Sequence, residues 1–137
     1  MSHVIYVSTA VSRMSEDDLV HLLRQARRRN KRLDITGMLL YQNGRFMQVL
    51  EGDEDQVNEI YLAIQNDWRH KNVDTLRAEQ IERRNFPDWS MGFRNIDTLE
   101  SVNEPGLTRL LDKGFKADFF RENYVEAHAL LLAFKKG

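Results

Sequence analysis

The chain has 137 residues and a formal net charge of −1, with 30% of its residues charged and both signs present. One domain is the natural expectation for this length, and the balanced charge argues against a surface built for nucleic acid or an acidic membrane. The sequence has no cysteine, which excludes disulfides, thiolate metal sites and thiol catalysis. No apolar run approaches the roughly 20 residues of a membrane span, so we expect a soluble, cytoplasmic protein.

The N-terminal part predicts a strand followed by a helix. Residues 4–8 are β-branched and aromatic, as strand residues usually are. Ser15 and Asp18 form an acidic variant of a capping box, which predicts that a helix begins there. That helix carries one stripe at steps of four, three and four, formed by Leu19, Leu23, Ala26 and Asn30. Asn30 therefore lies at the end of the helix, in line with its apolar face.

A hairpin and a second helix follow. Asn43-Gly44, the strongest short hairpin signal, separates the apolar run 35–41 from the strand-like residues 45–51. Asp53 then predicts the start of a helix. The apolar face of this helix has the spacing i, i+3, i+4 and i+7 and consists of Val57, Ile60, Tyr61 and Ile64.

The returning strand of the hairpin carries a glutamine where an apolar residue is expected. With a two-residue period, Gln48 shares a face with Phe46 and Leu50. An amide buried there without partners would cost roughly 1–3 kcal/mol, so a polar side chain or a ligand should meet it. An amide satisfied by the backbone alone is the alternative explanation.

Two more strands are predicted before the chain becomes helical again. They cover residues 73–80 and 89–96, with a turn over residues 86–88 between them. Beyond Asn103 the apolar positions recur at helical spacing. They form a short stripe and a longer one: Leu107, Leu110 and Leu111, then Phe120, Tyr124, Ala127, Leu131 and Phe134.

This order of elements predicts an α+β fold with a ferredoxin-like topology, βαββαββ, around a five-stranded mixed sheet. Right-handed crossovers place the first two helices on one face, and the two C-terminal helices are the apolar surface left to cover the other. The first and third strands are then neighbours, so Tyr6 and Gln48 can lie side by side beneath the first two helices. We expect one domain over residues 1–97, with residues 98–137 as a helical extension packed on it.

Short motifs recur along the chain at a spacing that points to one family. They are Tyr6 with Ser8, Asn30, and the segments 34–41, 46–52, 67–70 and 86–91. In this order, from residue 3 to residue 96, they resemble the BLUF domain, a family of bacterial and algal sensors of blue light that use a flavin. Each motif is weak alone, but the ITG…LLY, F-x-Q-x-LEG and D-x-RH blocks together are highly specific.

The resemblance implies that a flavin, usually FAD, is held between the first two helices, with FMN or riboflavin as the alternatives. Tyr6 would donate an electron to the photoexcited ring. Gln48 would bridge the Tyr6 hydroxyl and the N5/O4 edge of the flavin, while Asn30 would hydrogen-bond the carbonyl edge of the ring. Trp89 and Met91 match a segment of the last strand that exchanges places near Gln48 during signalling.

The resemblance also implies further flavin contacts around these residues. Asp67, Arg69 and His70 would lie near the ring or the ribityl chain. The remaining implied contacts are Ser8, Arg29, Ile35, Phe46 and Ile64. The chain departs from the family at Arg29, where a second Asn or a His is common, and at Ala63, where Lys or Arg is common. The second departure removes a phosphate contact of the family and leaves the choice of flavin open.

From the residues alone, several of these positions have a plainer explanation. Tyr6 fits an ordinary core tyrosine, and Asn30 fits a helix C-terminus in a left-handed conformation. Trp89 and Met91 share a strand face with Phe93 in the predicted strand, so core packing alone accounts for them.

The charged candidates also have a plainer explanation. Arg27 and Arg28 fit a solvated helix face, and Arg69 with His70 fits a helix end, where cations are favourable. The four histidines are dispersed and include no i, i+4 pair, which argues against a metal site.

The resulting hypothesis is a blue-light photoreceptor rather than an enzyme. Light is the input and no substrate is consumed. No catalytic domain fits after residue 100, so the output should pass through a separate signalling protein or a change in self-association. A homo-oligomer, dimeric or larger, is the expected assembly, with no direct contact to nucleic acid or membrane.

Three other functions share this topology or cofactor. An acylphosphatase-like hydrolase needs an anion-binding loop after the first strand, but residues 9–14 contain no glycine to shape one. An RNA-recognition module exposes two or three stacking aromatics on its central strands, whereas Tyr6 and Phe46 alternate with aliphatic residues here. A flavin-dependent redox enzyme needs a substrate cavity and a nicotinamide site, and no motif suggests either.

Overall fold

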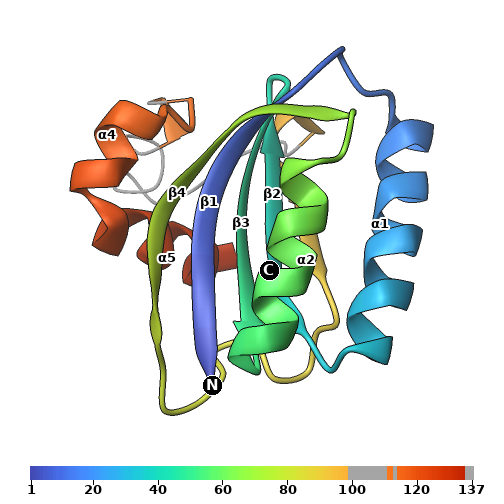
Figure 1. Ribbon diagram of the computed structural model, residues 1–137. Coiled ribbons are helices and arrows are strands. Elements are labelled where there is room, and N and C mark those ends of the chain that lie inside the picture. The colour runs from blue at the N-terminus through green and yellow to red at the C-terminus, as the bar shows by residue number, and fades with distance from the viewer. Residues whose placement is uncertain (99–110, 113, 135–137) are drawn as a thin grey trace.

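The computed structural model describes residues 1–98, 111, 112 and 114–134. Its centre is a five-stranded sheet with the strand order β4-β1-β3-β2-β5 (Figure 1). The strands are β1 (Ser2–Ala10), β2 (Thr36–Gln42), β3 (Arg45–Gly52), β4 (His70–Gln80) and β5 (Gly92–Asn95). The β2–β5 pair is parallel and the other pairs are antiparallel, so the sheet is mixed as expected.

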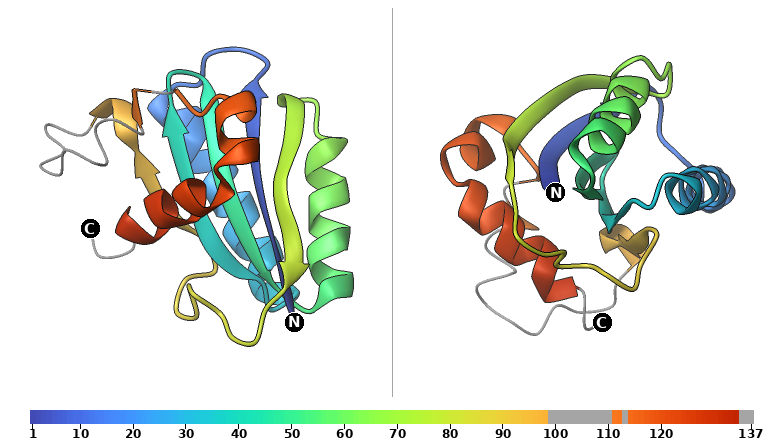
Figure 2. Two further views of the ribbon diagram at one scale, coloured as in Figure 1. Left: turned by 90° about the vertical axis from the view of Figure 1, so that its left-hand side faces the viewer. Right: turned by 60° about the horizontal axis from the view of Figure 1, so that its bottom comes forward.

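Helices cover both faces of the sheet (Figures 1 and 2). On one face lie α1 (Glu16–Arg32) and α2 (Glu54–Gln65), and on the other lie α4 (Ala117–Glu122) and α5 (Tyr124–Ala133). A short 3-10 turn, η1 (Ile96–Thr98), follows β5. The α+β, ferredoxin-like prediction is confirmed. Within the described residues, no helix has both the length and the apolar character needed to cross a bilayer.

The hairpin between β2 and β3 sets the register of the sheet. Asn43 and Gly44 have φ values of 48° and 78°, the two positive φ angles that a type I′ turn requires. The turn pairs β2 with β3 so that Gln48 lies opposite Leu39. On its other side β3 pairs with β1, and there Gln48 lies opposite Tyr6. The predicted side-by-side placement of Tyr6 and Gln48 is confirmed.

The two faces of the sheet bury separate apolar clusters. Val4, Leu39 and Leu50 face α1 and α2, together with Tyr6. Alternate residues of the same strands pack against the C-terminal helices: Ile5, Val7, Met38, Leu40, Met47 and Val49. This division follows from the two-residue period of a strand. Gln48 therefore faces the α1–α2 layer, while its neighbours Met47 and Val49 face α4 and α5.

Both helices begin where the sequence predicts, but only α1 has the predicted side-chain cap. The side chain of Ser15 accepts a hydrogen bond from the Asp18 backbone N–H, and the Asp18 carboxylate accepts one from the Ser15 backbone N–H, which confirms the capping box. Asp53 is the N-cap of α2, but its side chain makes no capping hydrogen bond. The acidic residues Glu54 and Asp55 still place negative charge in the first turn, where the helix dipole favours it.

Two helices cover this face as predicted, but the longer apolar stripe is divided between them, because the helix is broken at Asn123. This residue ends α4 and starts α5 with φ −127° and ψ 48°, and its side-chain amide donates to the Phe119 carbonyl at 2.8 Å. An asparagine that bonds to nearby backbone competes with helix continuation. The predicted stripe still points inward, since Phe120, Ala127 and Leu131 are fully buried. Leu107 and Leu110 of the shorter stripe lie outside the described residues.

Candidate functional site

A cavity of ≈ 150 Å³ lies between the sheet and the two N-terminal helices. Its lining combines apolar walls with polar groups and consists of Tyr6, Leu22, Gln25, Ala26, Arg29, Leu39, Gln48, Ile64, Asp67, Arg69 and His70. A second cavity of ≈ 690 Å³ shares Gln25, Arg29, Asp67 and Arg69 with the first. The two cavities together form a polar-rimmed site between α1 and the C-terminal end of α2.

Tyr6 and Gln48, which both line the smaller cavity, form a chain of contacts with Met91. The Tyr6 hydroxyl donates to Oε1 of Gln48. Nε2 of Gln48 in turn donates to the Met91 sulfur at 3.3 Å. A thioether is a weak acceptor, so one end of the amide is held much less firmly than the other. The buried glutamine thus meets polar partners from two other strands or loops, rather than backbone alone.

The Tyr6 phenol is held in its neutral form. Burial raises the pKa of Tyr6 well above its usual value, and nearby Tyr61 raises this pKa further. The two rings lie 5.2 Å apart at an angle of 42°, and the Tyr61 hydroxyl is hydrogen-bonded to Thr75. At neutral pH the Tyr6 hydroxyl therefore keeps its proton and donates it to Gln48.

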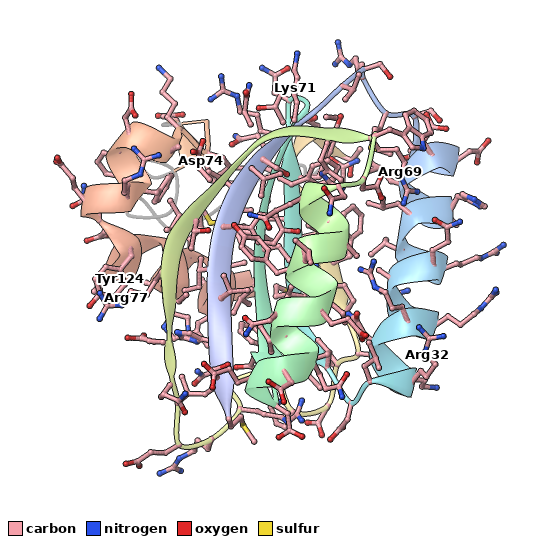
Figure 3. The ribbon with its side chains drawn as sticks, viewed as in Figure 1. Arg32, Arg69, Lys71, Asp74, Arg77 and Tyr124 are labelled. Carbon is pink, nitrogen blue, oxygen red and sulfur yellow. The ribbon has the colours of Figure 1, made fainter. Side chains whose placement is uncertain are left out.

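The segment after α2 closes one side of the cavity. Arg69 bonds to the Asp67 carboxylate, with Nη2 at 2.7 Å from Oδ2, and its Nη1 donates to Oε1 of Gln25 on α1 at 3.0 Å. Arg69 thus connects the segment after α2 with α1. Figure 3 shows Arg69 near the top of these two helices. The hydrogen bonds from Arg69 lower the pKa of Asp67, so the carboxylate stays charged. Burial lowers the pKa of His70, which lies 3.2 Å from the Ser8 hydroxyl and is neutral near pH 7.

Two residues at the end of α1 carry buried polar atoms without a partner among the described residues. Nε of Arg29 and Oδ1 of Asn30 are both inaccessible to solvent and make no hydrogen bond. Asn30 is fully buried in a helical position, not in the left-handed conformation weighed above, and its Nδ2 donates to the Ser90 carbonyl at 2.7 Å. Unsatisfied buried groups of this kind are costly, and a ligand with complementary atoms would satisfy them.

Trp89 and Met91 lie on opposite sides of the sheet, so the expectation that they share a face is wrong. Met91 is 2% exposed and belongs to the cluster beneath α1 and α2. Trp89 packs with Phe86 on the side of the C-terminal helices, with ring centroids 6.4 Å apart. The reason is that β5 begins only at Gly92, so the preceding turn does not follow the alternation of a strand.

The absence of a side chain at Gly92 leaves space for the indole ring of Trp89. A Cβ atom on Gly92 would lie 2.3 Å from the indole ring of Trp89 and 2.7 Å from the sulfur of Met38. Any other residue at position 92 would therefore displace the indole ring.

Several predicted contact residues do not line the cavity. Ser8 and Phe46 contact His70 instead, whose ring centroid is 5.0 Å from that of Phe46. Ile35 is buried in the core beside Gly52. The direct flavin contacts expected for these residues stay predictions, and here Ser8 and Phe46 orient His70.

Other residues contribute to the site without having been predicted. Leu22, Gln25 and Ala26 line the cavity with Arg29, at the i, i+3, i+4 and i+7 spacing of one helix face. The same spacing is visible in the sequence, next to the predicted stripe of Leu19, Leu23, Ala26 and Asn30. Arg27 is the larger surprise, because its Nε donates to the Met91 carbonyl at 2.9 Å, although a solvated arginine was expected.

The model of one protein family matches residues 1–92, and its description is "Sensors of blue-light using FAD". The chain belongs to the BLUF family. The matched region contains the Tyr6–Gln48 pair, the α1–α2 cavity and Met91. The resemblance drawn from the sequence motifs is thereby confirmed, and the chain is a BLUF blue-light sensor.

Solved BLUF structures have the same architecture. The dark-state structure of BlrB, a BLUF protein, is 33% identical with a TM-score of 0.77, and the match covers 96% of this chain and 95% of that one. A bacterial light-regulated adenylyl cyclase is 30% identical with a TM-score of 0.80, covering 90% of this chain and 36% of the other. These matches show that the described fold is the BLUF fold.

A curated relative is the photoactivated adenylate cyclase subunit beta of Euglena longa, which is 37% identical over 126 residues. The match covers 91% of this chain but 14% of that protein, so the chain spans about a seventh of the relative's length. The cyclase activity named there belongs to that larger protein.

FAD is the cofactor of the family, and the residues of this chain fit a flavin. Leu22, Ala26 and Ile64 provide apolar walls for a flat ring. The unpartnered Oδ1 of Asn30, a residue that does not itself line the cavity, has the acceptor chemistry that the imide N–H of a flavin would need, and the Arg29 guanidinium has the donor chemistry that its carbonyl or phosphate oxygens would need. Arg29 lines both cavities, which suits a cofactor with a ring at one end and a charged tail at the other.

Proposed function

We propose that Tyr6 and Gln48 convert light absorbed in the α1–α2 cavity into a movement of residues 87–91. The observation that carries the proposal is the Tyr6–Gln48–Met91 contact chain, in which a buried amide has a strong partner at one end and a weak one at the other. An amide in this position can turn over because the Tyr6 oxygen can accept from Nε2 in place of its present bond to Oε1, so that only the weak thioether contact on the Met91 side is left without a replacement.

When bound, the flavin supplies the blue-light absorption and, on excitation, a strong oxidant. Tyr6 acts as the electron donor. Because its phenol is neutral before the light reaction, loss of an electron to the excited ring would make the O–H strongly acidic, and its proton would pass through Gln48, entering at Oε1 along the existing hydrogen bond while another leaves from Nε2. On return of the electron and proton, the amide of Gln48 is left rearranged by rotation or tautomerism.

The rearranged amide changes the contacts of residues 87–91, the segment that contains Met91. In the arrangement described above, which we take as the resting one, Gln48 donates to the Met91 sulfur. Once Nε2 points elsewhere, Met91 loses this contact and the segment loses one of the bonds that hold it to the cavity. A hydrogen-bond exchange shifts a two-state equilibrium by only a few kcal/mol, so the segment must be nearly balanced between two positions.

The output of the sensor is a change recognised by a separate protein. BLUF relatives include light-regulated adenylyl cyclases, in which the sensor is part of a longer chain. For this chain we propose a signalling partner that recognises β5 and the C-terminal helices, with a homodimer or larger assembly as the working unit. The division into a sensor domain over 1–97 and an extension over 98–137 belongs to this proposal. The cytoplasmic location stays a prediction.

The test is a spectrum of the purified chain reconstituted with FAD. Blue light should shift the flavin absorption band to the red, and the shift should relax in darkness. Gln48→Ala should bind FAD and lose the shift completely, because no amide is left to rearrange. Tyr6→Phe should bind FAD and fail to photocycle, because the electron donor is gone.

Gln80→Ala is the matched control, since Gln80 is also a strand glutamine but lies at the opposite end of β4 from the cavity residue His70 and bonds to Glu54 instead. It should keep a normal shift. A normal red shift in Gln48→Ala would remove the amide from its role, and a normal photocycle in Tyr6→Phe would do the same for the tyrosine.

A further inference from the structure

Glu51 is a fully buried carboxylate that the proposed light reaction does not use. It stands three residues after Gln48 on β3, and the two-residue period points it to the opposite face of the sheet. A buried charge is tolerated only when it is well paired. Here Oε2 accepts from the Asn85 backbone N–H at 2.6 Å, and Oε1 accepts from the Phe86 N–H at 2.8 Å and from the Thr36 hydroxyl at 3.1 Å.

Arg84 strengthens the same attachment. Its Nη1 donates to the Thr36 hydroxyl at 2.9 Å and to the Glu51 carbonyl at 3.2 Å. Its Nη2 donates to the carbonyl of Asp34 at 2.8 Å and to the Asp34 carboxylate at 3.1 Å. Residues 84–86 are therefore bound to the adjoining ends of β2 and β3 through several charge-assisted hydrogen bonds, the strongest class in proteins.

The other end of the segment is held by isolated contacts. The Trp89 carbonyl accepts from the Gly37 backbone at 3.1 Å, and the Ser90 carbonyl accepts from Asn30 at 2.7 Å. Met91 has the Arg27 contact at its carbonyl and the Gln48 contact at its sulfur. Each of these bonds can break without exposing a buried charge. The segment thus has one end bound to a buried carboxylate by several hydrogen bonds, and one end held by single bonds, of which the charge-assisted one comes from the exposed Arg27.

We propose that Glu51 is a positioning residue of the photocycle, the fixed pivot that confines the light-driven movement to residues 87–91. This inference rests on the proposed function, because it describes how the segment beside Gln48 moves. Glu51 touches neither the cavity nor Gln48. It acts through the Asn85 and Phe86 backbone, which it holds in place while residues 89–91 break their hydrogen bonds to Gly37, Asn30 and Gln48.

Amide hydrogen exchange of the FAD-loaded chain, in darkness and under steady blue light, tests the pivot without a mutation. The Asn85 and Phe86 amides should keep the same protection in both conditions, because their hydrogen bonds to the Glu51 carboxylate stay intact. The Gly37 amide should lose protection in the light, because its acceptor is the carbonyl of Trp89. Loss of protection at Asn85 and Phe86 together with Gly37 would overturn the proposal. Unchanged protection at all three, in a chain that photocycles normally, would also overturn it, since nothing then pivots.

The variant Glu51→Gln weakens the pivot with little change in shape. One carboxylate oxygen becomes an NH₂ group, which cannot accept from the Asn85 or Phe86 backbone. The variant should bind FAD and keep its red shift, while dark recovery becomes about tenfold faster because the segment no longer rearranges against a fixed end. Trp89 emission, read in a Trp68→Phe background, should become easier to quench by a dissolved quencher.

Glu79→Gln is the matched control, because Glu79 bonds to His3 and Arg77 on the sheet and does not touch the segment. Its recovery rate should stay within about twofold of the parent. Equal recovery rates in Glu51→Gln and the parent would overturn the pivot. If Glu51→Gln fails to fold, Arg84→Gln replaces it, with a smaller acceleration expected in the same direction. An absent red shift in the parent chain would instead mean that the proposed function itself has failed.

Discussion

Gln48 and Glu51 stand three residues apart on one strand, and each buries a polar side chain on a different face of the sheet. Gln48 is neutral, borders a cavity and ends in a weak contact to sulfur. Glu51 carries a carboxylate, borders no described cavity in the part of the chain that the structure covers, and is fully paired with backbone and hydroxyl donors. The strand therefore presents a group that can change partners on one face and one that cannot on the other.

The difference teaches what a switch and an anchor each require. A group that switches needs an alternative partner of similar strength and space to turn, so that two states differ by only a few kcal/mol. A group that anchors needs partners whose loss would leave a buried charge unpaired, which is far more costly. Residues 85–91, of which 87–91 are the part proposed to move, contact both groups: Asn85 and Phe86 contact Glu51, and Met91 contacts Gln48.

The largest effect that separates the two faces is expected for Phe120→Ala. Phe120 is fully buried in the cluster under α4 and α5, on the face without the flavin cavity. Truncation of a buried phenylalanine lowers the free energy of unfolding by about 3–5 kcal/mol, measurable by urea titration. The folded variant should keep the red shift of the parent. Val125→Ala, at a side chain that is 64% exposed, is the control and should change stability by less than about 0.5 kcal/mol.

An altered red shift in folded Phe120→Ala would break the comparison, because the two faces would then be coupled through the sheet.

A smaller effect is expected for Arg27→Ala, which tests the end of the segment that is held by single bonds. The variant removes the hydrogen bond from Nε to the Met91 carbonyl, which holds the resting arrangement. Loss of roughly 1 kcal/mol from that state should slow dark recovery about fivefold. Arg28→Ala is the control, because Arg28 is the exposed neighbour on the same helix. Identical recovery in the two variants would show that Arg27 does not hold the segment.

The smallest effect is expected from two histidines, one on each face. Burial lowers the pKa of His70 beside the cavity and the pKa of His128 on α5 from their usual value of 6.5. Between the folded and unfolded pKa values the unfolded chain binds more protons, so stability falls as the pH drops through that range. Each histidine contributes at most about 1.4 kcal/mol per pH unit to this slope.

Denaturant titrations between about pH 7 and pH 5.5 should show this decline, and His70→Asn and His128→Asn should each flatten part of it. If His70→Asn alone removed the whole dependence of the unfolding free energy on pH, His70 would be the group that titrates in this range, and His128 on the other face would contribute nothing.

Much of the fold could be predicted because its signals are local. The Ser15–Asp18 box, the Asn43-Gly44 turn and the alternation of β3 each act within a few residues. Combined with the right-handed crossovers of the ferredoxin-like topology, they place Gln48 beside Tyr6, so the centre of the candidate site was accessible from the sequence. The helix break at Asn123 was missed, because an apolar stripe continues across it and only the side-chain bond to Phe119 marks the end of α4.

The amino-acid pattern alone was enough to place the first four strands, both faces of the sheet and the amide at its centre, since periodicity and turn chemistry depend on neighbours in the chain. The sides taken by Trp89 and Met91, the contact of Arg27 with Met91, and the partners of Glu51 could come only from the folded chain. All of these depend on a turn of irregular backbone that lies against residues more than thirty positions away. No local period describes such a turn, because its conformation is set by the bonds it finds on the finished sheet.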